Sequence, residues 1–166
     1  MLSLQFNVLA ANYPRRSFVP TADLFREIGW DDLIKDPKYE NTCATRVSLA
    51  LIKSGIIIPD ARMSIRRGPF KNHRIEPGQV KLSHILARNT MLGAPEKYKN
   101  DQRQALGKIG ERRGIVSFFH LIPGLYEGGH IDIVSPDFQR MNQGTENRCG
   151  TACHWTAAEV WFWPLH

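Results

Sequence analysis

Cys43 has the surroundings of a nucleophilic thiol. It stands in the stretch YENTCATRVSLALIKSG, where the apolar periodicity predicts a helix from Thr42 to Ser54. Thr42 is the expected N-cap, and Gly55 lies where a C-terminal cap belongs. Cys43 therefore falls in the first turn, where free N–H groups and the positive end of the helix dipole favour a thiolate. The alternative is a buried structural thiol, because free cysteine is common in protein cores.

His130 is the candidate base, because it begins the predicted strand His130–Val134 directly after Gly128 and Gly129. The glycine pair allows a substrate backbone to approach closely. In cysteine hydrolases a helix-borne thiolate attacks a carbonyl carbon, and a histidine far away in the sequence protonates the leaving amine. The other internal histidines have less specific surroundings: His120 lies in an apolar strand, and surface positions are predicted for His73, His84 and His154.

The remaining two cysteines form the motif CGTAC, Cys149 to Cys153. One pair plus one leftover cysteine is the count expected for a disulfide and a reactive thiol. Such a disulfide closes a small loop and indicates an oxidising compartment. A zinc site that uses Cys149, Cys153 and His154 is the competing interpretation, although structural zinc cysteines more often occur as paired Cys-x-x-Cys motifs. We expect no metal or other cofactor.

The predicted elements place helices first and an antiparallel sheet second. The helical stretches are Thr21 to Ile34, which Gly29 interrupts, then Thr42 to Ser54 and Gln79 to Leu92. Turn-rich sequence with short strands separates the last two helices. The β-branched and aromatic runs that follow predict strands at Gly114 to Ile122, His130 to Val134 and Glu159 to Leu165. This order predicts an α+β fold, in which the early helix packs on the sheet.

The composition indicates one globular domain, residues 1–166, with an acidic partner. The chain has a formal net charge of +6, which favours nucleic acid, an anionic lipid surface or a carboxylate-rich polymer such as cell wall. The basic residues are dispersed, as in the Arg pairs at 15–16, 66–67 and 112–113, so nucleic-acid binding is not expected. We also expect no secretory signal and no membrane insertion.

Several segments together resemble the type VI secretion amidase effectors of family 4. The resemblance covers most of the chain and depends on the order and spacing of its motifs. They are FNVLAANYP, the nucleophile helix NTCATRVSLALIKSG, LSHILARNTMLGAPEKY, KIGERRGIVSFFHL, GGHIDIV with the catalytic histidine, the disulfide loop CGTAC and the closing strand VWFWPL.

The resemblance implies a papain-like, NlpC-type cysteine peptidase fold and a peptidoglycan amidase. Family members are small antibacterial toxins that cut the stem peptide at the γ-linked amide between D-glutamate and meso-diaminopimelate. The type VI secretion machinery delivers them to the periplasm of a rival cell, and a cognate immunity protein protects the producer. The resemblance also implies that Cys43 and His130 are catalytic and that Cys149 pairs with Cys153 in a disulfide.

The resemblance does not identify the third catalytic residue, because the family carries an aspartate in the cysteine loop and this loop has Gly150, Thr151 and Ala152 instead. A third polar group usually orients the histidine. Asp132 lies two positions after His130, on the same side of the strand, and is the preferred candidate. Its alternative role is an exposed acid or an ion-pair partner. The other candidates are Asp137 and Asn142.

Further residues are candidates for binding the substrate. The oxyanion donors would be the Cys43 N–H and a group from the segment Tyr39–Asn41. Arg46 is a candidate partner for a substrate carboxylate, or forms a salt bridge from an outward helix position. Tyr126 lies in the loop before His130 and is expected to shape the cleft.

Three other functions stay open. The same fold supports a thiol acyltransferase or a protein-directed cysteine protease, since substrate choice depends on the loops. A non-catalytic basic binding module is the alternative from another class, and it predicts salt-dependent binding without thiol reactivity.

Overall fold

The computed structural model describes residues 2–99, 104–122, 128–136 and 154–166. The chain divides into two compact units, which are described separately: a helical unit, Asn7–Ile85, and a sheet unit, which combines Met1–Phe6 with Leu86–His166. The single domain predicted for residues 1–166 stays a prediction. In the described part of the chain, no helix has the length and apolar character needed to cross a membrane.

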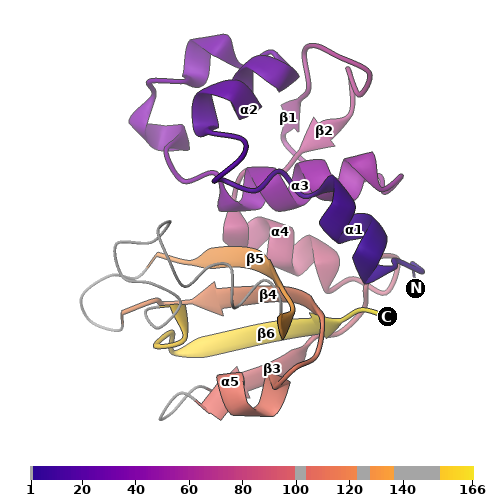
Figure 1. Ribbon diagram of the computed structural model, residues 1–166, viewed down its shortest axis with the longest axis vertical. Helices are drawn as coiled ribbons and strands as arrows, with labels where there is room; N and C mark the ends of the chain where they lie inside the picture. The colour runs from indigo at the N-terminus through magenta and orange to yellow at the C-terminus, as the bar shows by residue number, and fades with distance from the viewer. Residues whose placement is uncertain (1, 100–103, 123–127, 137–153) are drawn as a thin grey trace. The chain divides into compact units, whose positions relative to one another are not determined.

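The helical unit contains most of the helices and one short hairpin (Figure 1). The helical stretch predicted for Thr21 to Ile34 ends as an α-helix at Ile28, because Gly29 adopts a left-handed conformation with φ 77°, and only a separate 3-10 turn follows it. The elements, in chain order, are α1 (Phe6–Asn12), α2 (Thr21–Ile28), the 3-10 turns η1 (Asp31–Leu33) and η2 (Pro37–Tyr39), α3 (Cys43–Lys53), the paired strands β1 (Met63–Ser64) and β2 (Arg74–Ile75), and α4 (Gln79–Leu86).

The α3 helix confirms the helix predicted around Cys43 and is buried along nearly its whole length. Its residues from Cys43 to Ile52 are all buried, including Arg46 and Ser48. Large apolar side chains such as Phe25 and Trp30 are fully buried in the same unit. A helix that is surrounded in this way gains its stability from packing rather than from intrinsic propensity. Its polar residues must therefore find partners inside the unit.

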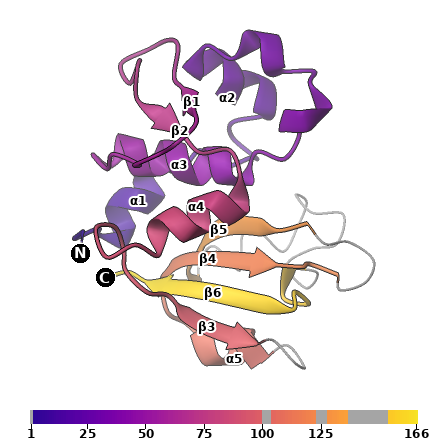
Figure 2. The same ribbon diagram turned by 180° about the vertical axis from the view of Figure 1, so that it is seen from behind.

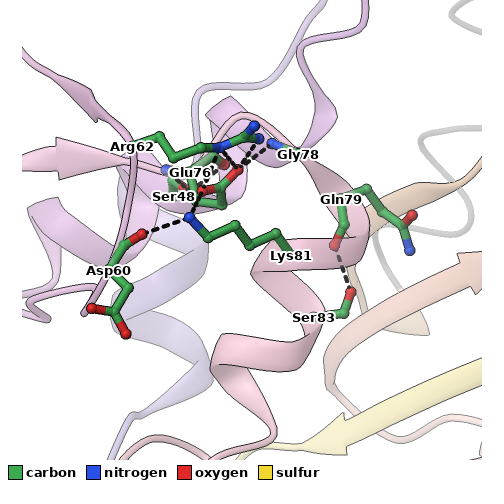
Figure 3. Close-up of polar contacts among 8 residues, drawn as sticks. All are labelled: Ser48, Asp60, Arg62, Glu76, Gly78, Gln79, Lys81 and Ser83. Atoms are coloured by element: carbon green, nitrogen blue, oxygen red, sulfur yellow. Dashed lines mark hydrogen bonds and ion pairs between the residues drawn. The ribbon is translucent and has the colours of Figure 1, made fainter.

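A buried carboxylate cluster ties α3 to the start of α4 (Figure 3). The Glu76 side chain is fully buried, and its two oxygens accept hydrogen bonds of 3.0 and 3.1 Å from Nε of Arg62. Its Oε1 also accepts the Gly78 N–H at 2.9 Å, and Nζ of Lys81 lies 3.3 Å from Oε2. On the α3 side, the Ser48 hydroxyl donates to the Glu76 carbonyl at 3.0 Å and accepts its N–H at 3.3 Å.

The sheet unit contains a four-stranded antiparallel sheet with the order β3-β6-β4-β5 (Figures 1 and 2). Residues Val116, Phe118, Val160 and Phe162 of the sheet share a buried apolar cluster with the helix that follows β3. The elements are β3 (Glu96–Lys99), α5 (Gln104–Ile109), β4 (Gly114–Phe119), β5 (His130–Val134) and β6 (Glu159–Pro164). The strand pairs among the described residues of this sheet are antiparallel, which agrees with the predicted α+β class.

Several boundaries differ from the sequence prediction, among them the ends of one helix and two strands. The helix predicted to Leu92 ends at Leu86, because the chain turns so that the Leu92 N–H bonds to the Leu86 carbonyl at 3.1 Å. The strand predicted to Ile122 ends at Phe119, because His120 adopts a positive φ of 53°. The last strand ends at Pro164 rather than at the following leucine. The packing of α3 on the sheet stays a prediction, since the two belong to different units.

Candidate active site

Cys43 is the first residue of α3, is buried at 7% exposure and carries a free thiol. Its backbone N–H donates to Oδ1 of Asn41 at 3.1 Å. The side chain of Thr42 does not cap the helix, contrary to expectation, and its hydroxyl instead accepts a hydrogen bond of 2.9 Å from Nε of Arg46. Asn41 therefore provides the side-chain cap, and the N–H predicted as an oxyanion donor is held by the Asn41 carbonyl oxygen.

The expected outward position of Arg46 is wrong, because its side chain is buried at 3% exposure. Its Nη1 donates to the backbone carbonyls of Pro14 at 2.7 Å and Val19 at 2.8 Å. A guanidinium carries five N–H donors in a rigid fork, so it can hold several carbonyls at once. These contacts give Arg46 a structural role at α3, and its contact with a substrate carboxylate stays a prediction.

In the sheet unit, the structure brings His130 and Asp132 together on β5. Nε2 of His130 lies 3.2 Å from Oδ2 of Asp132, within hydrogen-bonding distance. The two residues are two positions apart on a strand, so their side chains lie on the same face, as predicted. Oδ1 of Asp132 accepts the Ile133 N–H at 2.8 Å, which fixes the carboxylate. This geometry suits a carboxylate that orients an imidazole and selects its tautomer.

Two aromatic residues surround the His130 ring. The strand register places Phe118 of β4 directly opposite, with ring centroids 6.2 Å apart and an interplanar angle of 21°. The His154 ring stacks on His130 at 4.0 Å and 15°. The predicted surface position of His154 is therefore wrong: burial, together with the charge of His130, lowers the pKa of His154 to about 3, although Asp132 acts in the opposite direction.

Sequence reasoning missed this stacked partner, because the contact joins strand β5 to a residue just before β6 and follows no periodicity. A weak local signal was that His154 directly precedes a tryptophan, and the structure buries this Trp155 at 4% exposure. The surface positions of His73 and His84 are confirmed. His120 follows β4 rather than lying within it.

Several predicted site residues lie outside the described part of the chain, and their roles stay predictions. They are Tyr126, Asp137, Asn142, Cys149 and Cys153. The disulfide and the competing zinc site are thus both undecided; among the described residues, no group of three or more His, Cys, Asp or Glu side chains is placed to hold a metal ion. Cys43 belongs to the helical unit and His130 to the sheet unit, so their pairing also stays a prediction.

A family model and several solved structures match this chain, and they name the same family. A family model described as Tae4, type VI secretion system (T6SS) amidase effector protein 4, matches residues 39–163. No curated protein matches the chain. Among solved structures, the effector Tae4 from Enterobacter cloacae has a TM-score of 0.69 and 16% identity, covering 99% of this chain and 98% of that chain.

Two effector–immunity complexes are also similar in structure. The Tae4–Tai4 complex from Enterobacter cloacae has a TM-score of 0.66 at 15% identity, with 99% of this chain and 100% of that chain covered. The Tae4/Tai4 system from Salmonella typhimurium has a TM-score of 0.64 at 17% identity, with 98% of each chain covered. At these identities the likeness shows a shared fold.

Proposed function

The chain belongs to the type VI secretion system amidase effector family 4, and from this membership we propose that it hydrolyses the γ-D-glutamyl–meso-diaminopimelate bond of peptidoglycan stem peptides. The family makes the protein an antibacterial peptidoglycan amidase. The observation that carries the proposal is the family match over residues 39–163, which contains both α3 with Cys43 and β5 with His130 and Asp132. The net charge of +6 suits an anionic cell-wall polymer.

We propose that Cys43 is the nucleophile and His130 its acid–base partner. The Cys43 proton moves to His130, and the thiolate attacks the γ-carbonyl carbon of D-glutamate, so that a C–S bond forms and the carbonyl electron pair moves onto oxygen. When the tetrahedral intermediate collapses, the C–N bond breaks and His130 protonates the departing diaminopimelate amine. Water then attacks the thioester carbon and gives a proton to His130, so that a C–O bond forms. The C–S bond breaks, the Cys43 sulfur takes the proton back from His130, and the γ-carboxyl group of D-glutamate is released.

Asp132 supports the role of His130 through its bond to Nε2. If Nε2–H donates to the carboxylate, Nδ1 is the nitrogen that exchanges the proton with Cys43 and the leaving amine. The carboxylate also stabilises the imidazolium that forms during the reaction. This assignment makes Asp132 the third catalytic residue in preference to Asp137 or Asn142.

The oxyanion is proposed to bind the Cys43 N–H together with a group from the Tyr39–Asn41 segment. Because Asn41 accepts that N–H in the structure, its side chain must give way when the substrate oxygen takes its place. We retain Arg46 and Tyr126 as proposed substrate contacts, and Arg46 is the weaker of the two because its guanidinium already holds backbone carbonyls.

Membership of the family suggests how the protein is delivered and which partner inhibits it. We propose that the type VI machinery delivers the protein to the periplasm of a target bacterium. The Cys149–Cys153 disulfide would form there, since cytosolic thiols are normally reduced. Related Tae4 effectors have been solved with Tai4 immunity proteins, and a cognate immunity protein of this kind is the proposed partner.

The test is a digest of purified Gram-negative sacculi, read by mass spectrometry of the released muropeptides. Wild type should cut between D-glutamate and diaminopimelate, and folded Cys43→Ala and His130→Ala should not. Asp132→Asn should lower the rate by roughly 10²–10⁴-fold, the range for a positioned acid–base group. A cut at the diaminopimelate–D-alanine crosslink would overturn the assigned bond. Absence of cleavage by reduced, folded wild type would point to a protein substrate or a binding role.

A further inference from the structure

The His154 ring covers one face of the proposed catalytic imidazole. The centroids of the His130 and His154 rings are 4.0 Å apart and their planes differ by 15°, so the two rings are in stacking contact. Both residues belong to the sheet unit. The contact therefore lies within one described unit and does not depend on how the two units are arranged.

The surroundings of His154 hold its ring in place. Phe118 packs against it with ring centroids 5.6 Å apart and an interplanar angle of 30°, and Trp155 meets Phe118 edge-on at 4.9 Å. The backbone is also fixed, because the Ala157 N–H donates to the His154 carbonyl at 3.0 Å. An aromatic ring with two side-chain torsions that packs on a buried neighbour loses its freedom at low entropic cost.

A stacked neighbour adds to the contact with Asp132, because a hydrogen bond at one ring atom does not by itself fix the ring plane. Asp132 holds the imidazole at Nε2 and the strand holds it at Cβ, so the ring can still turn about the line between these two points. Phe118 lies farther away than His154, with centroids 6.2 Å against 4.0 Å from the His130 ring. A stacked ring removes this rotation by restricting the plane. Proton transfer depends on the direction of the lone pair as well as on distance, so the plane affects the rate of reaction.

The charge state of His154 is compatible with this role. Burial and the charge of His130 hold its pKa well below the ordinary value, at about 3. Near neutral pH, His154 is therefore neutral when His130 becomes an imidazolium, and the stacked pair carries one positive charge rather than two. Asp132 is the other charged group that acts on His154, and its carboxylate favours the positive form.

We propose that His154 is a positioning residue, whose ring face fixes the plane of the His130 imidazole for proton transfer. This rests on the proposed function, which makes His130 the acid–base residue. The inference concerns the ring face of His154 and not its nitrogens. An aromatic ring without nitrogens should therefore replace it, whereas a side chain without a ring should not.

The experiment compares His154→Phe, His154→Ala and wild type in two measurements. The first is the NMR signal of the His130 ring in histidine-labelled protein, assigned with His130→Ala. We expect the signal to move towards the value of a solvent-exposed histidine in His154→Ala and to stay near wild type in His154→Phe. The matched control is His73→Ala, which removes an exposed histidine that packs edge-on against Phe70 in the other unit.

The second measurement is kcat and KM on a defined stem peptide, with folding checked by circular dichroism. His154→Ala should lower kcat by about 10- to 100-fold with little change in KM, as expected for a misaligned catalytic group. His154→Phe should stay within about 3-fold of wild type, because the stacked ring remains. An unchanged His130 signal or kcat in His154→Ala would overturn the proposal.

An equal loss of kcat in His154→Ala and His154→Phe would also overturn the proposal. A nitrogen of His154 would then matter rather than its ring face, as in a zinc site with Cys149 and Cys153. If wild type does not cleave the stem peptide, the proposed function fails. The NMR signals still decide whether His154 holds the His130 ring, so the two failures are distinguishable.

Discussion

Replacing Glu76 by glutamine tests how far the cluster in Figure 3 stabilises the helical unit through charge. The carboxylate is fully buried, whereas its partners Arg62 and Lys81 keep 54% and 40% of their side chains exposed. Glutamine has nearly the same shape and keeps an oxygen that can accept the Gly78 N–H. The substitution therefore removes the negative charge and leaves the packing and one hydrogen bond in place.

The expected loss follows from the contacts that disappear. A hydrogen bond to a charged group contributes about 1.5–3 kcal/mol, whereas an exposed ion pair contributes about 1 kcal/mol or less. Arg62 and Lys81 regain water when the carboxylate is gone, which limits the cost. We expect Glu76→Gln to lower the free energy of unfolding by about 1–3 kcal/mol near neutral pH. At about 2–4 °C per kcal/mol, Tm should fall by roughly 2–12 °C.

The loss of stability that Glu76→Gln causes should depend on pH. Burial raises the pKa of Glu76, but the hydrogen bonds from Arg62 and Gly78 outweigh this and hold the pKa below its ordinary value of 4.5. The unfolded chain then takes up the proton at higher pH than the folded protein does. The stabilisation is therefore complete above about pH 5 and is lost as pH falls through the folded pKa. Glu76→Gln has no carboxylate to protonate at this position. The free energies of unfolding of wild type and Glu76→Gln should therefore become similar in acid.

The assay is urea unfolding of wild type and Glu76→Gln at neutral pH and at about pH 3.5. The matched control is Asp32→Asn, because Asp32 pairs with Arg66 at 2.6 Å with both side chains about half exposed. This control should change stability by about 1 kcal/mol or less. Equal stability of Glu76→Gln and wild type at neutral pH would refute the reasoning, as would a difference that persists unchanged in acid.

Two further substitutions test the packing of each unit. Arg46→Met should lower the free energy of unfolding by about 2–5 kcal/mol in urea, because it leaves buried carbonyls without their donor; a loss below about 1 kcal/mol would contradict the anchoring role. Gly114→Ala should cost about 2–4 kcal/mol or prevent folding, because the added Cβ would lie 2.1 Å from the Trp163 carbonyl oxygen. Its control, Gly107→Ala in α5, has open space and should gain about 0.5–1 kcal/mol in thermal unfolding. A tolerated Gly114→Ala would show that the two strands can separate at this point.

The elements around the candidate site were predictable because their signals are local. The α3 helix is marked by its apolar spacing and by a glycine just beyond its end, and the predicted Thr42 to Ser54 agrees with Cys43–Lys53 to one residue at each end. The β5 strand alternates after a glycine pair and was predicted with its observed bounds. The contact of Asp132 with His130 follows from the same alternation.

The elements that were missed depend on partners far away in the sequence. The β3 strand, EKYK, has no apolar alternation, and it forms because it pairs with β6. Across this pair, Nζ of Lys97 lies 3.8 Å from the centroid of the Trp161 ring. The α5 helix is short and is stabilised by the apolar cluster that it completes with the sheet. Strand pairing and helix docking are tertiary effects that override local preference.

The surface position predicted for Arg46 was wrong because a buried helix also needs polar side chains. A helix that is covered on nearly every side meets the backbone of the segments that cover it, and those segments bring carbonyls and N–H groups that need partners. Arg46 binds the carbonyls of Pro14 and Val19, while Ser48 binds both backbone groups of Glu76. These polar residues hold two separate segments of the unit on α3. Because Cys43 begins that helix, they restrict the position of the thiol without touching it.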